Sequence, residues 1–188
     1  MVENDEEKEE KSHYTPEEVA PIDEQFAVHF KKNGGKFIYC ENWNEVSQNF
    51  ENILAENDWF EQNPLCFNPK LFRFLEENKL AESNSLSALF FMTTCENLIA
   101  SDGSILFSSN QIKHLKPKEL PVNIVVFATT SQFVSTKSDA LTRINNLHKN
   151  NYPSNIIAIN YFEETKDKNY MHYGSCYKNI YLLLLEDL

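Results

Sequence analysis

Short apolar runs alternate along this chain with longer stretches in which apolar residues recur every three or four positions. The runs have the length and the β-branched and aromatic content of strands. Two of them, residues 86–93 and 123–129, are apolar nearly throughout, which is typical of strands in a sheet covered on both faces. We expect strands at residues 36–40, 86–93, 98–100, 105–107, 123–129, 155–159 and 180–185.

The longer stretches predict amphipathic helices. The first has a start signal at Thr15-Pro16-Glu17-Glu18, in which Thr15 caps the helix and Glu18 completes a capping box. Its apolar positions run to Phe30, and Asn33-Gly34-Gly35 ends it because glycine readily adopts the left-handed conformation of a helix cap. Further helices are expected at residues 43–55, 69–78 and 139–148. The alternation of helices and strands predicts the α/β class.

One stretch, residues 98–109, carries the strongest turn signal of the chain. Two apolar runs flank Asp102-Gly103, a pair that favours a tight hairpin with a primed turn. Hydroxyl side chains crowd this turn, at Ser101, Ser104, Ser108 and Ser109. A turn rich in hydroxyls and backbone N–H groups can hold an anion. The alternative interpretation is an ordinary hairpin with a polar tip.

The charge balance narrows the classes of partner. The chain of 188 residues has 28 acidic and 17 basic residues, which gives a formal net charge of −11. Such a field repels nucleic acid and anionic membranes, so neither partner is expected. Residues 1–14 are mostly charged and predict a disordered acidic tail. The remainder, residues 15–188, is expected to form a single α/β domain.

The four cysteines, Cys40, Cys66, Cys95 and Cys176, lie far apart and show no metal-ligand spacing. We therefore expect no metal site and no cofactor, and we interpret the thiols as buried cytosolic cysteines. The acidic start is the opposite of a signal peptide, and no apolar run has membrane-spanning length. These features predict a cytoplasmic protein.

A candidate ligand site follows from the rule that open α/β sheets bind ligands at the carboxyl ends of their strands. We expect the bends after Ala100 and Ala128 to open onto one shared cleft that binds a small anionic metabolite. The predicted ligand-binding residues are Ser101, Asp102, Gly103, Ser104, Ser108, Ser109, Thr129, Thr130, Ser131, Gly174 and Ser175. The alternative is that these residues only cap helices and turns.

Two carboxylates near this site, Glu96 and Asp102, are the candidates for catalysis by general acid or base. The competing interpretation makes them solvated loop charges. Cys95, next to Glu96, is a candidate nucleophile, although no histidine stands near it in the sequence and a buried inert thiol is the alternative.

Several segments, in this order and spacing, resemble the lactate-utilisation (LUD) domain family of bacterial proteins. They are Phe26-Ala-Val-His-Phe-Lys-Lys-Asn-Gly-Gly35, Cys95-Glu-Asn-Leu-Ile-Ala-Ser-Asp-Gly-Ser-Ile-Leu-Phe-Ser-Ser109, Pro121-Val-Asn-Ile-Val-Val-Phe-Ala128 and Tyr173-Gly-Ser175. The resemblance implies a three-layer α/β/α fold with a mainly parallel sheet, of the NagB/RpiA/CoA-transferase type. It also implies a role beside iron–sulfur partner subunits that oxidise L-lactate to pyruvate.

The chain departs from the family pattern in two places, as a short branch of the family would. The family commonly has Ala-Glu-Thr-Gly-Thr at the hairpin, and this chain has Ser101 at the glutamate position. Many relatives carry Gly-Pro-Ser-Arg-Thr-Ala-Asp-Ile-Glu before the last strand, and residues 162–175 lack it. An arginine that could bind a carboxylate or phosphate is therefore missing.

Three functions stay open on the sequence. The first is a lactate-utilisation subunit that works with iron–sulfur partners. The second is a free-standing enzyme on the same fold that acts on a sugar phosphate or an acyl-CoA ester. The third is a non-catalytic metabolite-binding or regulatory subunit, which the missing glutamate and arginine favour. The fold type also suggests a homodimer.

Overall fold

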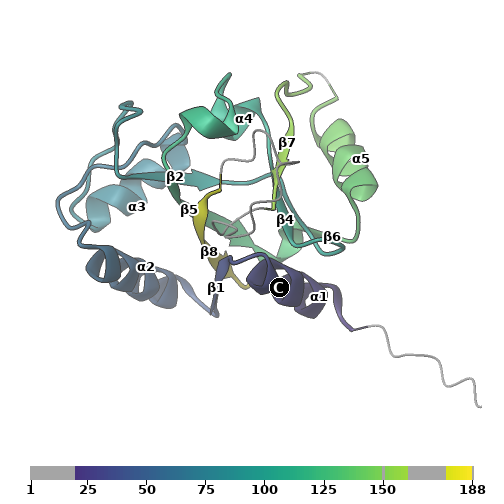
Figure 1. The fold of residues 1–188 in the computed structure, drawn as a ribbon, viewed down its shortest axis with the longest axis horizontal. Coiled ribbons are helices and arrows are strands. Elements are labelled where there is room, and N and C mark those ends of the chain that lie inside the picture. The colour runs from purple at the N-terminus through teal and green to yellow at the C-terminus, as the bar shows by residue number, and fades with distance from the viewer. Residues whose placement is uncertain (1–19, 150, 161–176, 188) are drawn as a thin grey trace, which may run out of the picture.

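A four-stranded parallel sheet forms the centre of the molecule (Figure 1). The structure, a computed structural model, describes residues 20–149, 151–160 and 177–187. The strands lie in the order β1, β8, β5, β2, so the last strand of the chain is an inner strand. Their bounds are β1 Lys36–Cys40, β2 Phe90–Thr94, β5 Asn123–Thr129 and β8 Asn179–Leu185.

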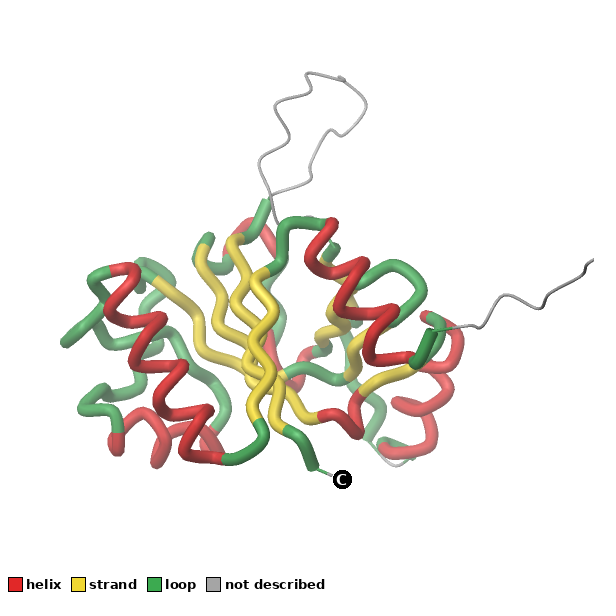
Figure 2. The backbone as a smooth tube through the Cα atoms, turned by 90° about the horizontal axis from the view of Figure 1, so that it is seen from below, coloured by secondary structure: helices red, strands yellow, loops and turns green. Residues whose placement is uncertain are grey.

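Helices cover both faces of this sheet (Figure 2), which is why its strands are apolar on both sides. On one face lie α2 (Trp43–Asn57), the 3₁₀ turn η1 (Pro69–Leu71) and α3 (Phe72–Glu77). The other face packs against α1 (Ile22–Lys32). Alternate residues of β5 pack into two separate hydrophobic cores, one on each face of the sheet. Val125 belongs to the core that contains Phe50 of α2, and Val126 to the core that contains Phe30 of α1.

A second, smaller sheet lies on the α1 side of the first. Its order is β6, β3, β4, β7, and it contains antiparallel as well as parallel pairs. Helix α5 packs on its outer face, around Ile99, Leu106 and Ile144. The strands of this sheet are β3 Asn97–Ile99, β4 Ser104–Phe107, β6 Phe133–Val134 and β7 Ile157–Ile159. The remaining helices and 3₁₀ turns are α4 Ser109–Ile112, η2 Pro117–Glu119, η3 Thr130–Gln132 and α5 Lys137–Leu147.

The predicted class, an α/β fold whose mainly parallel sheet is flanked by helices, is confirmed. Most predicted boundaries lie within two residues of the observed ones, and two differ by more. Helix α1 begins at Ile22, because Pro21 has extended backbone angles (φ −51°, ψ 152°) and its ring disfavours helix at Ala20. The predicted start signal, residues 15–18, lies outside the described residues. Strand β2 begins at Phe90, because residues 86–89 form a turn in which Leu86 and Leu89 are exposed. The predicted acidic tail, residues 1–14, lies outside the described residues.

In the described part of the chain, every helix is too short or too polar to cross a lipid bilayer.

Candidate functional site

The hairpin predicted around Asp102-Gly103 is present, with a different turn. Strands β3 and β4 pair antiparallel, and Ile99 opposite Ser104 is the last pair. Four residues, 100–103, therefore form the turn, and Gly103 N–H donates to the Ile99 carbonyl at 2.9 Å. Only Gly103 among them has a positive φ, at 67°. The primed turns of tight hairpins join their strands through two residues, and this loop has four, so that prediction was wrong.

This turn packs against the carboxyl end of α1. The His29 ring nitrogen Nδ1 lies 2.7 Å from the Ala100 carbonyl, and Asn33 Nδ2 donates to the Asp102 carbonyl at 2.7 Å. A Cβ atom on Gly103 would lie 2.4 Å from the backbone nitrogen of Phe30. Glycine is therefore required here both for its backbone angle and for the close approach of the helix.

The Asp102 carboxylate is engaged by its own chain. Its Oδ1 accepts hydrogen bonds from Ser104 Oγ at 2.6 Å and Ser104 N at 3.1 Å, and Lys137 Nζ lies 2.7 Å from Oδ2. Partial burial works against the charged form, but Lys137 and Ser104 outweigh it and lower the pKa of Asp102. Asp102 thus orders the turn and links it to the start of α5.

The two bends that the sequence placed around one cleft lie at opposite ends of β3, so the predicted shared cleft was wrong. The Ala100 bend follows the last residue of β3. The bend after Ala128 contacts the other end, where Gln132 Nε2 donates to the Cys95 carbonyl at 2.7 Å and Asn97 Nδ2 donates to the Gln132 carbonyl at 3.2 Å. The cause is that β6, which follows this bend, pairs parallel with β3.

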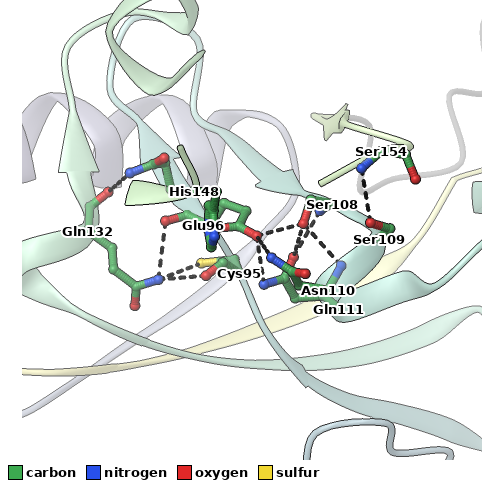
Figure 3. Close-up of polar contacts among 10 residues, drawn as sticks. Cys95, Glu96, Ser108, Ser109, Asn110, Gln111, Gln132, His148 and Ser154 are labelled. Atoms are coloured by element: carbon green, nitrogen blue, oxygen red, sulfur yellow. Dashed lines mark hydrogen bonds and ion pairs between the residues drawn. The ribbon is translucent and has the colours of Figure 1, made fainter. Parts of the chain in front are cut away.

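At that second end, side chains from several elements meet around Glu96 (Figure 3). Glu96 Oε1 accepts hydrogen bonds from Ser108 Oγ at 2.6 Å, Asn110 Nδ2 at 3.0 Å and Gln111 Nε2 at 3.1 Å. His148 Nε2 lies 3.6 Å from Glu96 Oε2. We call Glu96, Ser108, Asn110, Gln111 and His148 the Glu96 cluster.

The electrostatics of the cluster favour the charged carboxylate. The Glu96 side chain is only 9% exposed, and burial by itself raises a carboxyl pKa. Hydrogen bonds from Ser108, Gln111 and Asn110, together with the nearby His148, outweigh burial and lower the pKa of Glu96. The cluster therefore holds an anion, and that anion belongs to the protein.

Ser108 and Cys95 are poorly placed to act as nucleophiles. Ser108 is fully buried, caps α4 by accepting a hydrogen bond from Asn110 N at 3.1 Å, and donates its own hydroxyl hydrogen bond to Glu96. Burial strongly raises the pKa of the Cys95 thiol, with a further contribution from Glu96. A thiol needs its thiolate form to attack, so Cys95 is inert near neutral pH.

The hydroxyl-rich bend after Ala128 also binds a carboxylate of the chain itself. Asp187, just after β8, accepts hydrogen bonds from Thr130 Oγ1 at 2.7 Å, Ser131 N at 2.8 Å and Ser131 Oγ at 2.7 Å. The hydroxyls of Ser131 and Thr130 lower the pKa of Asp187. Thr129 Oγ1 lies 3.0 Å from Ser131 Oγ and completes this group.

The other predicted ligand residues lie apart from these two groups. Ser109 exchanges two hydrogen bonds with Ser154, at 2.8 and 3.1 Å. Ser101 is exposed, and its amide donates to the Ser135 carbonyl at 3.0 Å. Gly174 and Ser175 lie outside the described residues.

Sequence reasoning missed Gln111, His148 and Asp187 as members of these groups. Gln111 had a signal, since Ser108-x-x-Gln111 has the spacing of a capping box, and that box is present around α4. His148, at the end of α5, lies 52 positions from Glu96 in the chain. Asp187, just after β8, lies 57 positions from Thr130. No local pattern marks such long-range contacts.

Within residues 20–149, 151–160 and 177–187, no three His, Cys, Asp or Glu side chains are grouped as metal ligands.

Comparison with known proteins agrees with this architecture. A family model described as the LUD domain matches residues 57–175, which is more than half of the chain. The structure is similar to the crystal structure of a DUF162 family protein from Deinococcus radiodurans, with a TM-score of 0.58 and 11% identity, over 88% of this chain and 96% of that one. This likeness concerns the fold. The comparison with curated proteins found no match. The chain belongs to the LUD domain family.

Proposed function

We propose that this chain is the LUD-domain subunit of a system that oxidises L-lactate to pyruvate, and that it supplies no catalytic group itself. Iron–sulfur partner subunits would then carry the electrons. Membership of the LUD family supports the link to lactate. Such a subunit would work in the cytoplasm, in keeping with the free, buried thiols of Cys40, Cys66 and Cys95.

One observation supports the non-catalytic role above all: both candidate carboxylates are held in their charged form by donors of the chain. A general base works best when its pKa lies near the working pH. The pKa values of Glu96 and Asp102 are both lowered, which makes each a weak base. This favours a binding or regulatory subunit over a free-standing enzyme that uses either residue.

The test is a reconstituted assay in which L-lactate reduces a dye acceptor such as dichlorophenolindophenol. The purified chain alone should give no reduction, whereas the chain with the iron–sulfur proteins of a lactate-utilisation system should. The mixture without the chain should lose the activity. The double variant Glu96→Gln, Asp102→Asn should retain kcat within about twofold once its fold is verified by circular dichroism.

Two results would count against the proposal. A complete mixture that oxidises L-lactate equally well without the chain would remove the link to lactate. A loss of more than about tenfold in kcat for a well-folded double variant would show that one of the two carboxylates acts in the reaction.

A further inference from the structure

A surface cleft opens between the start of α2 and helix α3, on the face of the parallel sheet opposite to α1. Figure 1 shows where these two helices lie. It has a volume of about 480 Å³, within the usual range for small-molecule sites. From α2 it is lined by Trp43, Asn44 and Ser47, and from the η1–α3 segment by Lys70 and Arg73 among others. Trp43 comes shortly after β1 ends at Cys40, so the cleft lies near the carboxyl ends of the strands, where α/β sheets bind their ligands.

Trp43 gives this cleft a flat aromatic wall. One side of the indole stacks on Phe127 of β5, with ring centroids 5.0 Å apart and an angle of 20° between the planes. Phe74 contacts it at a centroid distance of 6.2 Å. Trp43 is nevertheless 53% exposed, whereas the other tryptophan, Trp59, is 5% exposed and stacks on Phe90. The indole is thus held in place by Phe127 while about half of its surface stays accessible to a ligand.

The charges of the cleft favour an anion, although the chain as a whole carries −11. Lys70 and Arg73 line it together with one carboxylate, Glu77. Among the described residues, the Lys70 ammonium has no carboxylate partner within ion-pair distance. Arg73 Nε pairs with Glu77 Oε1 at 2.9 Å, and both side chains are well exposed, so a stronger anion can displace Glu77 at little cost.

We propose that this cleft binds a nucleotide, with the base stacked on Trp43 and the phosphate between Lys70 and Arg73. Base–aromatic stacking is favourable for every base because each has a π-face. The guanidinium of Arg73 and the ammonium of Lys70 are both suited to phosphate oxygens. Asn44 and Ser47 add an amide and a hydroxyl that can bond polar atoms of the base or ribose. This site is separate from the Glu96 cluster and does not depend on the lactate proposal.

The direct test is calorimetric titration of the full chain with ADP, alongside adenosine and ribose 5-phosphate. We expect saturable binding of ADP with a Kd below about 1 mM. Adenosine, which lacks the phosphate, and ribose 5-phosphate, which lacks the base, should each bind at least about tenfold more weakly. ADP should also quench the tryptophan fluorescence, since Trp43 is the exposed tryptophan.

Substitutions in the cleft test the role of each side chain in ADP binding. Trp43→Leu should weaken ADP binding by about tenfold or more, the usual effect of losing a stacking partner. Lys70→Gln should weaken ADP binding several-fold and leave adenosine binding unchanged. The control is Lys118→Gln, at an exposed lysine on η2, which should leave ADP binding unchanged. Glu77→Gln should strengthen ADP binding several-fold because it releases Arg73 and removes a negative charge.

Three outcomes would overturn the proposal. The first is no heat and no quenching at about 1 mM ADP. The second is ADP binding that Trp43→Leu and Lys70→Gln leave unchanged in well-folded variants. The third is adenosine or ribose 5-phosphate binding as tightly as ADP, which would show that the cleft does not recognise base and phosphate together.

Discussion

At the scale of single residues, Glu96 illustrates how neutral hydrogen-bond donors can stabilise a nearly buried carboxylate; no lysine or arginine of the described residues is paired with it. Three neutral side chains, Ser108, Asn110 and Gln111, all donate to the same oxygen, Oε1. Among the described residues its ionisable partner is His148, whose Nε2 lies 3.6 Å from the other oxygen. Hydrogen bonds to a charged acceptor contribute more than neutral ones, and here they more than offset the cost of burial.

The Glu96 cluster makes a prediction about pH. A carboxyl whose pKa is lowered on folding stabilises the native state above its ordinary pKa, here 4.5, and this stabilisation is lost as the pH falls through the lower folded value. Glu96→Gln should therefore reduce the free energy of unfolding by about 1–3 kcal/mol at neutral pH. The difference from the wild-type chain should shrink as the pH drops below 4.5, as measured by urea titrations at several pH values.

Glu76→Gln is the matched control, because Glu76 is exposed on α3. Its effect should be small and should not resemble that of Glu96→Gln. A Glu96→Gln chain as stable as the wild type at neutral pH would mean that the cluster contributes no net stabilisation.

At the scale of elements, local sequence patterns predicted the strands and helices, whereas contacts between residues far apart in the chain could not be predicted. Strands β1 and β5 lie where their apolar runs placed them, at Lys36–Cys40 and Asn123–Thr129. Asn42 caps α2, where the predicted helix 43–55 begins, accepting a hydrogen bond from Glu45 N at 3.1 Å. A strand or a cap depends on neighbours in the chain, so a short window of sequence contains the necessary information.

The candidate site could be predicted only in part for the same reason. The sequence singled out Glu96, Ser108 and the Thr130–Ser131 bend as polar groups at strand ends. The partners of these polar groups depend on how the strands are ordered and paired in the sheets. That order brings Asp187 to Ser131 and His148 to Glu96. The same topology separates the Ala100 bend from the Ala128 bend, which no composition or spacing revealed.

The contact between the hairpin and α1 gives a prediction at this scale. Gly103→Ala places a Cβ 2.4 Å from Phe30 N and 2.5 Å from the carbonyl carbon of His29, at a φ of +67°. Because backbone atoms cannot rotate away as a side chain can, the helix or the turn must shift. We expect a loss of about 2–4 kcal/mol in unfolding free energy, measured by thermal or urea unfolding.

Ser101→Ala, in the same turn, separates this clash from a general sensitivity of the hairpin. Ser101 is exposed, so its substitution should change stability by less than about 0.5 kcal/mol. Equal effects of the two substitutions would show that the close approach of α1 is not what makes Gly103 necessary.

At the scale of the whole molecule, the sheet order makes the last strand indispensable. β8 lies between β1 and β5 and pairs with both along most of its length. Its residues alternate between the two cores, with Leu182 on the α1 side and Leu183 on the α2 side. Without β8, the sheet has a gap between strands that are far apart in the chain, and both cores lose buried side chains.

A chain that ends at Tyr177 should therefore fail to fold cooperatively, even though it keeps all five α-helices described between residues 20 and 149. Its circular dichroism should show no sigmoidal thermal transition, and its amide protons should exchange rapidly. A chain that ends at Glu186 keeps β8 and loses only Asp187 and Leu188, so it should melt cooperatively, slightly below the full chain because the Thr130–Ser131 bend has lost its carboxylate. Cooperative melting of the shorter chain would contradict the assignment of β8 as an inner strand, because β1 and the β5–β2 pair cannot bury their facing edges without it.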